Sequence, residues 1–185
     1  PGGPTSLGSA AGDTQVELAG TAPTSNGGAS LSGYKVESST GSGSSWSTVV
    51  ADTASTDTSY AATSLTNGTA YDFRVSAINS VGTGSASDTT TATPVTTPRV
   101  LTSLGSTAGD AQVDLAWTAP TSNGGASLSG YKVESSTDSG SSWSTVVADT
   151  ASTDTSYTAT SLTNGTAYDF RVSAINSVGT GSASD

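Results

Sequence analysis

Apolar and polar residues alternate along several short stretches of the chain. Val16 and Leu18 alternate with polar neighbours, and so do Tyr34 and Val36. In residues 71–77, Tyr, Phe, Val and Ala occupy every second position. A period of two predicts β-strands that have one buried and one solvated face, as in antiparallel sheets. No stretch has a helical period of useful length, so the pattern predicts an all-β fold.

Turn sequences separate these stretches. Asn26-Gly27-Gly28 and Asn67-Gly68 are two of them. They favour tight turns because glycine adopts a positive φ without steric cost, and asparagine tolerates it. Several short strands separated by such turns predict a β-sandwich or a barrel.

The whole pattern occurs twice. Residues 5–88 and 102–185 align with a constant offset of 97 and differ at six of 84 positions. A repeat of this length is a complete domain, since solenoid units mostly span roughly 20 to 50 residues. We expect a first domain at 1–93, a Thr/Pro-rich linker at 94–101 and a second domain at 102–185. The second copy stops before the counterpart of residues 89–93, so we expect its final strand to be largely missing.

Three segments resemble the fibronectin type III family. Leu65–Asn79 resembles the family's tyrosine corner, with Tyr71 six residues after the leucine. Gly33–Glu37 resembles the third strand, and Leu115–Pro120 resembles the second strand with its core Trp117. The resemblance implies two tandem immunoglobulin-like antiparallel β-sandwiches. The Ser/Thr/Gly-rich composition and the lack of Cys resemble bacterial or phage members of the family, which are surface or secreted proteins.

One position departs from the family in the first copy only. Gly20 stands where the second copy has Trp117. If this position belongs to the core, the loss of a Trp costs roughly 3–5 kcal/mol of stability or more. We therefore expect the first domain to unfold at a lower temperature than the second.

The net charge of −10, with five basic residues, excludes a large basic surface. A nucleic-acid partner is not expected, because phosphate binding needs such a surface. No apolar segment predicts insertion into a membrane. The chain has no Cys and no His, so it has no disulfide and cannot form the usual nucleophile–base pairs or zinc sites.

Carboxylates are the remaining candidates for chemistry. Asp52 and Asp57 fall in a predicted loop, where they could form a loose calcium site, although their spacing matches no known calcium loop. Glu37 and Asp72 fall on the polar faces of predicted strands, where we expect them to face solvent. We predict no catalytic residue, no cofactor and no metal site, and hence no enzyme.

Trp46 and Trp143 are the candidate ligand contacts. Each follows a Gly/Ser-rich hairpin turn. An exposed Trp on a β-surface could stack on a sugar ring, whereas the structural alternative is packing along the hairpin against Val49 or Val50. Asn67-Gly68-Thr69 and its repeat match the N-glycosylation pattern, although the turn alone explains Asn-Gly.

These observations favour a non-catalytic structural spacer or adhesion-type repeat in a larger extracellular, cell-surface or filament protein. Its partners would be neighbouring repeats of the same protein. The alternatives are a module that binds polysaccharide or a cell-surface receptor, or an accessory part of a secreted polysaccharide-degrading enzyme or a phage virion protein.

Overall fold

The computed structural model describes all residues from Pro1 to Asp185. It divides the chain into two compact units, Pro1–Val95 and Thr96–Asp185. Every regular element is a β-strand, and all named pairs of strands are antiparallel. The predicted all-β fold class is confirmed.

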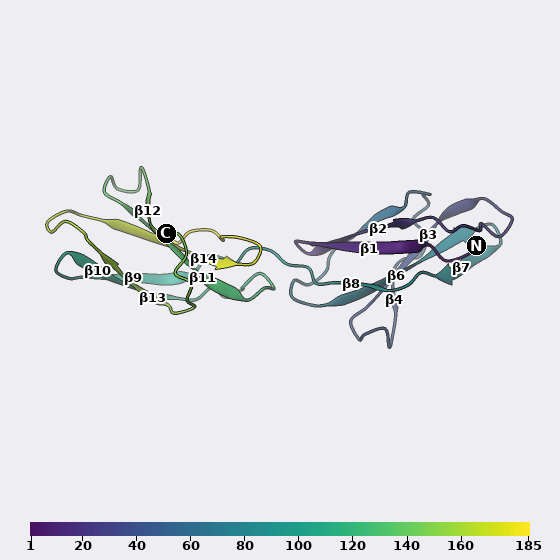
Figure 1. Cartoon of the computed structure of the whole chain (residues 1–185), viewed down its shortest axis with the longest axis horizontal. Helices are drawn as coiled ribbons and strands as arrows, with labels where there is room; N and C mark the ends of the chain where they lie inside the picture. The colour runs from purple at the N-terminus through teal and green to yellow at the C-terminus, as the bar shows by residue number, and fades with distance from the viewer. The chain divides into compact units, whose positions relative to one another are not determined.

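The first unit contains eight strands, which are β1 (Thr5–Gly12), β2 (Gln15–Thr21), β3 (Leu31–Ser39), β4 (Ser47–Val50), β5 (Ser59–Ala62), β6 (Tyr71–Asn79), β7 (Gly82–Ala86) and β8 (Thr90–Ala92). One sheet has the order β1-β2-β5. The other has the order β4-β3-β6-β7, and β8 also pairs with β6 (Figure 1). The two sheets form the sandwich that the sequence predicts.

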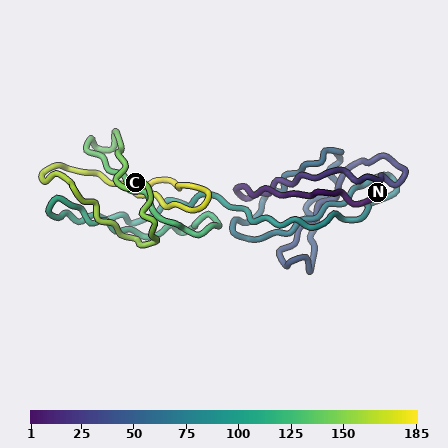
Figure 2. Tube along the Cα trace, viewed as in Figure 1, coloured from purple at the N-terminus to yellow at the C-terminus, as the bar shows by residue number.

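The second unit contains six strands, which are β9 (Thr102–Ala108), β10 (Gln112–Thr118), β11 (Leu128–Ser136), β12 (Ser144–Val147), β13 (Ser156–Thr160) and β14 (Asp169–Asn176). Its sheets have the orders β13-β10-β9 and β12-β11-β14. Figure 2 follows the chain through the strands of each unit in turn. No named strand follows β14, but an isolated bridge joins Ile175 to Thr180, and the N–H groups of Gly181 and Ser184 donate to the Ala174 and Val172 carbonyls of β14.

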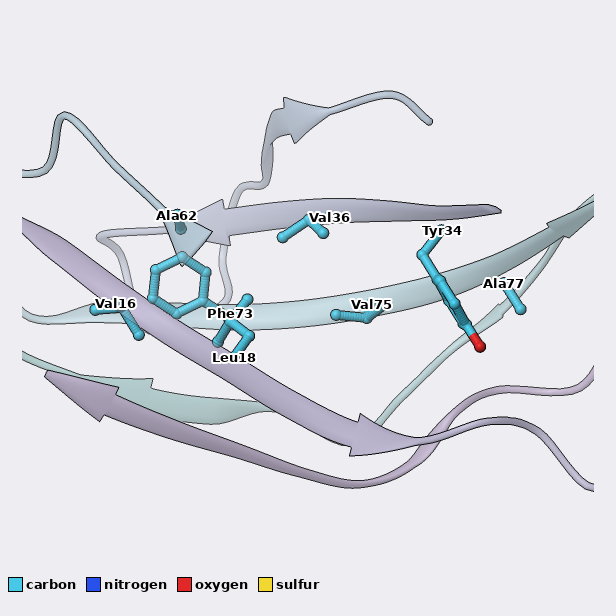
Figure 3. Close-up of a cluster of buried hydrophobic side chains, with 8 residues drawn as sticks. All are labelled: Val16, Leu18, Tyr34, Val36, Ala62, Phe73, Val75 and Ala77. Atoms are coloured by element: carbon cyan, nitrogen blue, oxygen red, sulfur yellow. The ribbon is translucent and has the colours of Figure 1, made fainter. Parts of the chain in front are cut away.

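The core of the first unit lies between its sheets (Figure 3). β2 contributes Val16 and Leu18, which alternate with the exposed Glu17. The other buried hydrophobic residues are Tyr34, Val36, Ala62, Phe73, Val75 and Ala77. The period-two pattern therefore identified the buried face, because alternate side chains of a strand point to opposite sides of its sheet.

The core of the second unit contains an additional large ring. Trp117 on β10 is 6% exposed, and its ring centroid lies 5.0 Å from that of Tyr131 in an edge-on arrangement. The same core contains Leu101, Leu115, Val133, Val172 and Ala174. The predicted core position of Trp117 is thus occupied as the family resemblance implies.

The Tyr71 hydroxyl holds the turn before β6. The backbone N–H of Thr66 donates to Tyr71 Oη at 3.1 Å, and Thr163 donates to Tyr168 Oη at 3.2 Å in the second unit. Each of these bonds joins the strand to a turn five residues upstream. This geometry is the tyrosine corner that the sequence resembles.

The segment 94–101, predicted as a linker, is divided between the two units. The Pro94 carbonyl accepts from Gly68, and the Val95 N–H donates to the Gly12 carbonyl of the first unit. The next residue, Thr96, donates instead to the Gly124 carbonyl of the second unit. The boundary falls at this point because adjacent residues are hydrogen-bonded into different units.

Candidate functional site

Trp46 lies at the end of the loop that joins β3 to β4. Ser39 Oγ accepts the backbone N–H groups of Gly41 and Gly43, which closes the loop over the end of β3. Gly43 has a φ of +76°, and a Cβ there would stand 3.5 Å from the Trp46 ring. This tight loop places a half-buried indole beside the outer face of the sheet.

Arg74 on β6 covers one face of this indole. Its guanidinium carbon lies 4.3 Å from the Trp46 ring centroid, which is a cation–π distance. The Arg74 Nε donates to Glu37 Oε2 at 2.9 Å, and Lys35 Nζ donates to Glu37 Oε1 at 2.6 Å. We call Lys35, Glu37, Arg74 and Trp46 the Trp–Arg cluster. Strand register creates it, because Glu37 pairs directly with Arg74 across β3 and β6.

The prediction that Glu37 faces solvent is wrong. Glu37 is 9% exposed and lies between two cations. The hydrogen bond from Lys35 is the main reason why the pKa of the Glu37 carboxyl is lower than usual, and burial opposes this shift. A carboxylate held ionised by two cations is a poor general acid.

The second unit repeats the cluster. Lys132 and Arg171 donate to the two oxygens of Glu134 at 2.7 and 2.8 Å, and the Arg171 guanidinium lies 4.4 Å from the Trp143 ring centroid. The Glu134 pKa is lowered in the same way, mainly by Lys132. The two clusters together contain four of the five basic residues of the chain.

The two loops differ at one residue. Asp138 replaces Gly41 and accepts hydrogen bonds from Ser136 Oγ at 2.7 Å and from Ser142 Oγ at 2.6 Å. The bond from Ser142 is the largest cause that lowers the pKa of Asp138 to about 2. Asp138 therefore fastens the loop that carries Trp143 in a way that Gly41 cannot.

The other carboxylates are not gathered into a site. Asp52 is exposed and accepts the N–H of Ala54 in its own turn at 2.9 Å, whereas Asp72 is half-buried and accepts from Thr91 Oγ1. Asp57 is exposed in the same loop as Asp52. No three acidic side chains approach closely enough to hold a metal ion.

Asn67, in the glycosylation-like sequence, has both side-chain atoms engaged. Its Oδ1 accepts from the Thr14 N–H at 2.9 Å, and its Nδ2 donates to Asp13 Oδ1 at 2.8 Å. Asn164 makes the same bonds to Ala111 and Asp110. The asparagine thus connects two turns of its sandwich.

Sequence reasoning identified Trp46 and Trp143 but missed their partners. The alternation in the sequence assigns both Lys35 and Arg74 only to the polar faces of their strands. One signal was available in the sequence: each copy has one Lys and one Arg in its strands, and both alternate with core residues. Pairing these strands would have placed the two cations around Glu37.

The structure contains no helix that is long enough and apolar enough to cross a membrane.

Comparisons with known proteins agree with the fold. The sequence profile described as "Fibronectin type III domain" matches residues 3–93 and 97–185. Titin of Drosophila melanogaster is 32% identical over 188 residues, which cover 98% of this chain and 1% of that protein. A titin homolog of Caenorhabditis elegans is 35% identical over 74 residues, which cover 40% of this chain and, after rounding, 0% of that protein.

Among solved structures, the crystal structure of chicken CNTN1 FN1-FN3 domains has 23% sequence identity and a TM-score of 0.47. The match covers 98% of this chain and 64% of that chain. The profile matches span almost the whole of both units and agree with the sandwich topology and the tyrosine corners. The chain therefore belongs to the fibronectin type III family, as two tandem domains.

Proposed function

We propose that the chain is a non-catalytic structural spacer, a pair of adhesion-type repeats that separates other parts of a larger extracellular or cell-surface protein. The observation that carries this proposal is the repetition itself. Two sandwiches, each with its own core, follow one another along the chain, with the boundary between Val95 and Thr96. Neighbouring repeats of the same protein are the proposed partners.

The state of the carboxylates supports a role without catalysis. Glu37 and Glu134 are neutralised by cations, while Asp52 and Asp57 lie exposed on a loop. A general acid or base needs a pKa near the working pH, which requires burial or a nearby like charge. Glu37 and Glu134 are buried, but their ion pairs outweigh burial and lower their pKa values, whereas Asp52 and Asp57 are exposed.

Small-angle scattering of the chain at several concentrations tests the spacer function. A compact globule of 185 residues would have a radius of gyration of about 16 Å. A spacer is expected to have a clearly larger radius that does not change with concentration. A radius near the compact value would contradict the spacer, and growth with concentration would favour a self-assembling filament.

The repeated Trp–Arg cluster favours a second candidate function, the binding of a polysaccharide. An indole edge beside an Arg and a Lys, each about 30% exposed, offers both an apolar contact and hydrogen-bond donors to a sugar. Arg74 covers one face of Trp46, so a sugar would contact the remaining part of the ring.

Retention on a panel of insoluble polysaccharides tests this second function. Replacement of both Trp46 and Trp143 by Ala should abolish retention. The control variant replaces the exposed Val81 and Val178, which lie on a different loop, by Ser and should bind normally. If the unmodified chain is retained by no polysaccharide, the second function is contradicted.

A further inference from the structure

The first unit has a cavity of about 30 Å³ beside Gly20, partly open to solvent. The cavity lies between the two sheets, and its walls include Leu7, Leu18, Tyr34, Val36 and Val75. Most of these side chains are apolar residues of the core. The interior of this unit is therefore incompletely filled at one defined place.

The second unit shows which group fits into this place. Trp117 occupies the position of Gly20, and the two residues have the same backbone bond: Gly20 donates to Thr58, and Trp117 donates to Thr155. The surrounding residues Leu104, Leu115, Tyr131, Val133 and Val172 are identical to their counterparts in the first unit. The same walls thus enclose an indole ring in one unit and a cavity in the other.

The cavity is smaller than an indole. A space of about 30 Å³ holds only one or two water-sized groups. A Cβ at position 20 would stand 3.3 Å from the Thr5 carbonyl oxygen, and the nearest side-chain atom to it would be Leu7 Cδ1 at 3.7 Å. Leu7 is half-buried on β1, the edge strand of its sheet, so an outward movement of this side chain can enlarge the space.

The tyrosine beside this space makes no side-chain hydrogen bond in either unit. The Tyr34 hydroxyl, on a residue that lines the cavity, is buried and has no partner. The Tyr131 hydroxyl and the Trp117 indole N–H of the second unit are also buried without a partner. The Trp117 ring therefore fills its place by packing and not by a hydrogen bond to the tyrosine.

We infer that the first unit binds a small planar aromatic molecule, of the size of indole, in the space that Trp117 fills in the second unit. The ring packs against Leu18, Val36 and Val75, as Trp117 packs among the identical residues of the second unit. This site does not depend on the proposed spacer function.

Titration of the full chain with indole, followed by heteronuclear NMR, tests the site. We expect saturable shifts with one site per chain, centred on Leu7, Leu18 and Tyr34, and a higher unfolding midpoint for the first unit. Shifts that stay linear up to the solubility limit, or that centre on other residues, would overturn the site.

Two variants provide matched controls. Gly20→Trp fills the space covalently and should abolish the saturable shifts, and Gly20→Leu serves the same purpose if the larger ring prevents folding. Trp117→Gly recreates the cavity in the second unit and should add a second indole site. Unchanged binding in either folded Gly20 variant would overturn the inference.

Discussion

Gly33 lies at a position where a side chain has no room. A Cβ there would overlap the Asp52 carboxylate and would stand 3.1 Å from the Ala54 backbone nitrogen. That carboxylate is held in place because it accepts the Ala54 N–H. The glycine is therefore required by close packing, although its φ is not in the left-handed region.

Gly33→Ala should destabilise the first unit by about 1–3 kcal/mol, the usual cost of overpacking. The added methyl must displace Asp52 and break its turn with Ala54. Denaturant unfolding of the full chain measures the effect. Gly8→Ala is the matched control, because Gly8 is exposed and a Cβ there meets only a carbonyl oxygen at 3.9 Å. Equal midpoints for the two variants would contradict the packing argument.

Glu37 makes stability depend on pH. Its pKa is lowered in the folded chain, mainly by the bond from Lys35, so folding favours the ionised carboxylate. The stabilisation is complete above the ordinary glutamate pKa of about 4.3 and is lost as the pH falls through the lower folded value. We expect the loss to begin below about pH 4.3.

Unfolding curves between neutral pH and pH 2 for Glu37→Gln measure this contribution. The variant should be less stable than the unmodified chain at neutral pH, and the difference should shrink in acid. Glu17→Gln, which removes an exposed carboxylate on β2, is the control. A difference that stays constant with pH would show that the ionisation of Glu37 does not contribute.

The tyrosine corner fixes the start of β6. The Tyr71 hydroxyl accepts the Thr66 N–H, and its ring lies 6.1 Å from that of Phe73. Removal of the hydroxyl leaves the ring contacts in place but leaves a turn N–H without its partner. The hydrogen bond can therefore be tested separately from the packing.

Tyr71→Phe should lower the stability of the first unit by about 0.5–1.5 kcal/mol, the net value of one hydrogen bond. Amide hydrogen exchange should show faster exchange at Thr66 than in the unmodified chain. Tyr60→Phe removes a hydroxyl outside the corner and should leave this amide unchanged. Unaltered exchange at Thr66 in Tyr71→Phe would contradict the assignment.

The pairing of β3 with β6 accounts for both the core and the Trp–Arg cluster. On its inner side the pairing places Val36 beside Val75, and on its outer side it places Glu37 beside Arg74. A shift of one residue would exchange the two faces, so burial of Val36 and Val75 also fixes the outer neighbours. The cluster is thus a consequence of the register that the core selects.

At the scale of the molecule, the two nearly identical domains differ in a core residue, which is Gly20 in the first and Trp117 in the second. The sequence predicts that the first domain unfolds at the lower temperature, and this stays a prediction. The cavity beside Gly20 supports it. The second unit, however, has no named counterpart of β7 or β8 and differs at five further aligned positions, so a comparison between units would combine several differences.

Substitutions within each unit measure the contribution of the Trp ring to stability separately from the other differences between the units. Trp117→Gly should destabilise the second unit by roughly 3–5 kcal/mol or more, by analogy with other large-to-small core changes. Gly20→Trp should stabilise the first unit by less than this, because Leu7 must move outward to admit the ring. Denaturant unfolding of the full chain, with the units resolved by NMR, measures both, and an unaffected second unit in Trp117→Gly would contradict the core role.

The amino-acid sequence by itself determined the strands, the turns and the division into two repeats. Val16, Leu18, Phe73 and Val75 reveal their burial through the period of two, since alternation is a local property of a strand. The tyrosine corner was also readable, because its partners lie five residues apart. The resemblance to one family then identified the second and third strands and the tyrosine corner.

Only the tertiary structure decided the surroundings of the functional candidates. Glu37 and Arg74 are 37 residues apart, and their ion pair depends on a strand register that no local pattern states. The boundary at Val95 and Thr96 depends on bonds to Gly12 and Gly124, which lie 83 and 28 residues away in the sequence. The cavity beside Gly20 exists because two sheets enclose a space whose size depends on how far side chains such as Leu7 close over it. Long-range packing sets these features, and alternation along a strand contains no information about them.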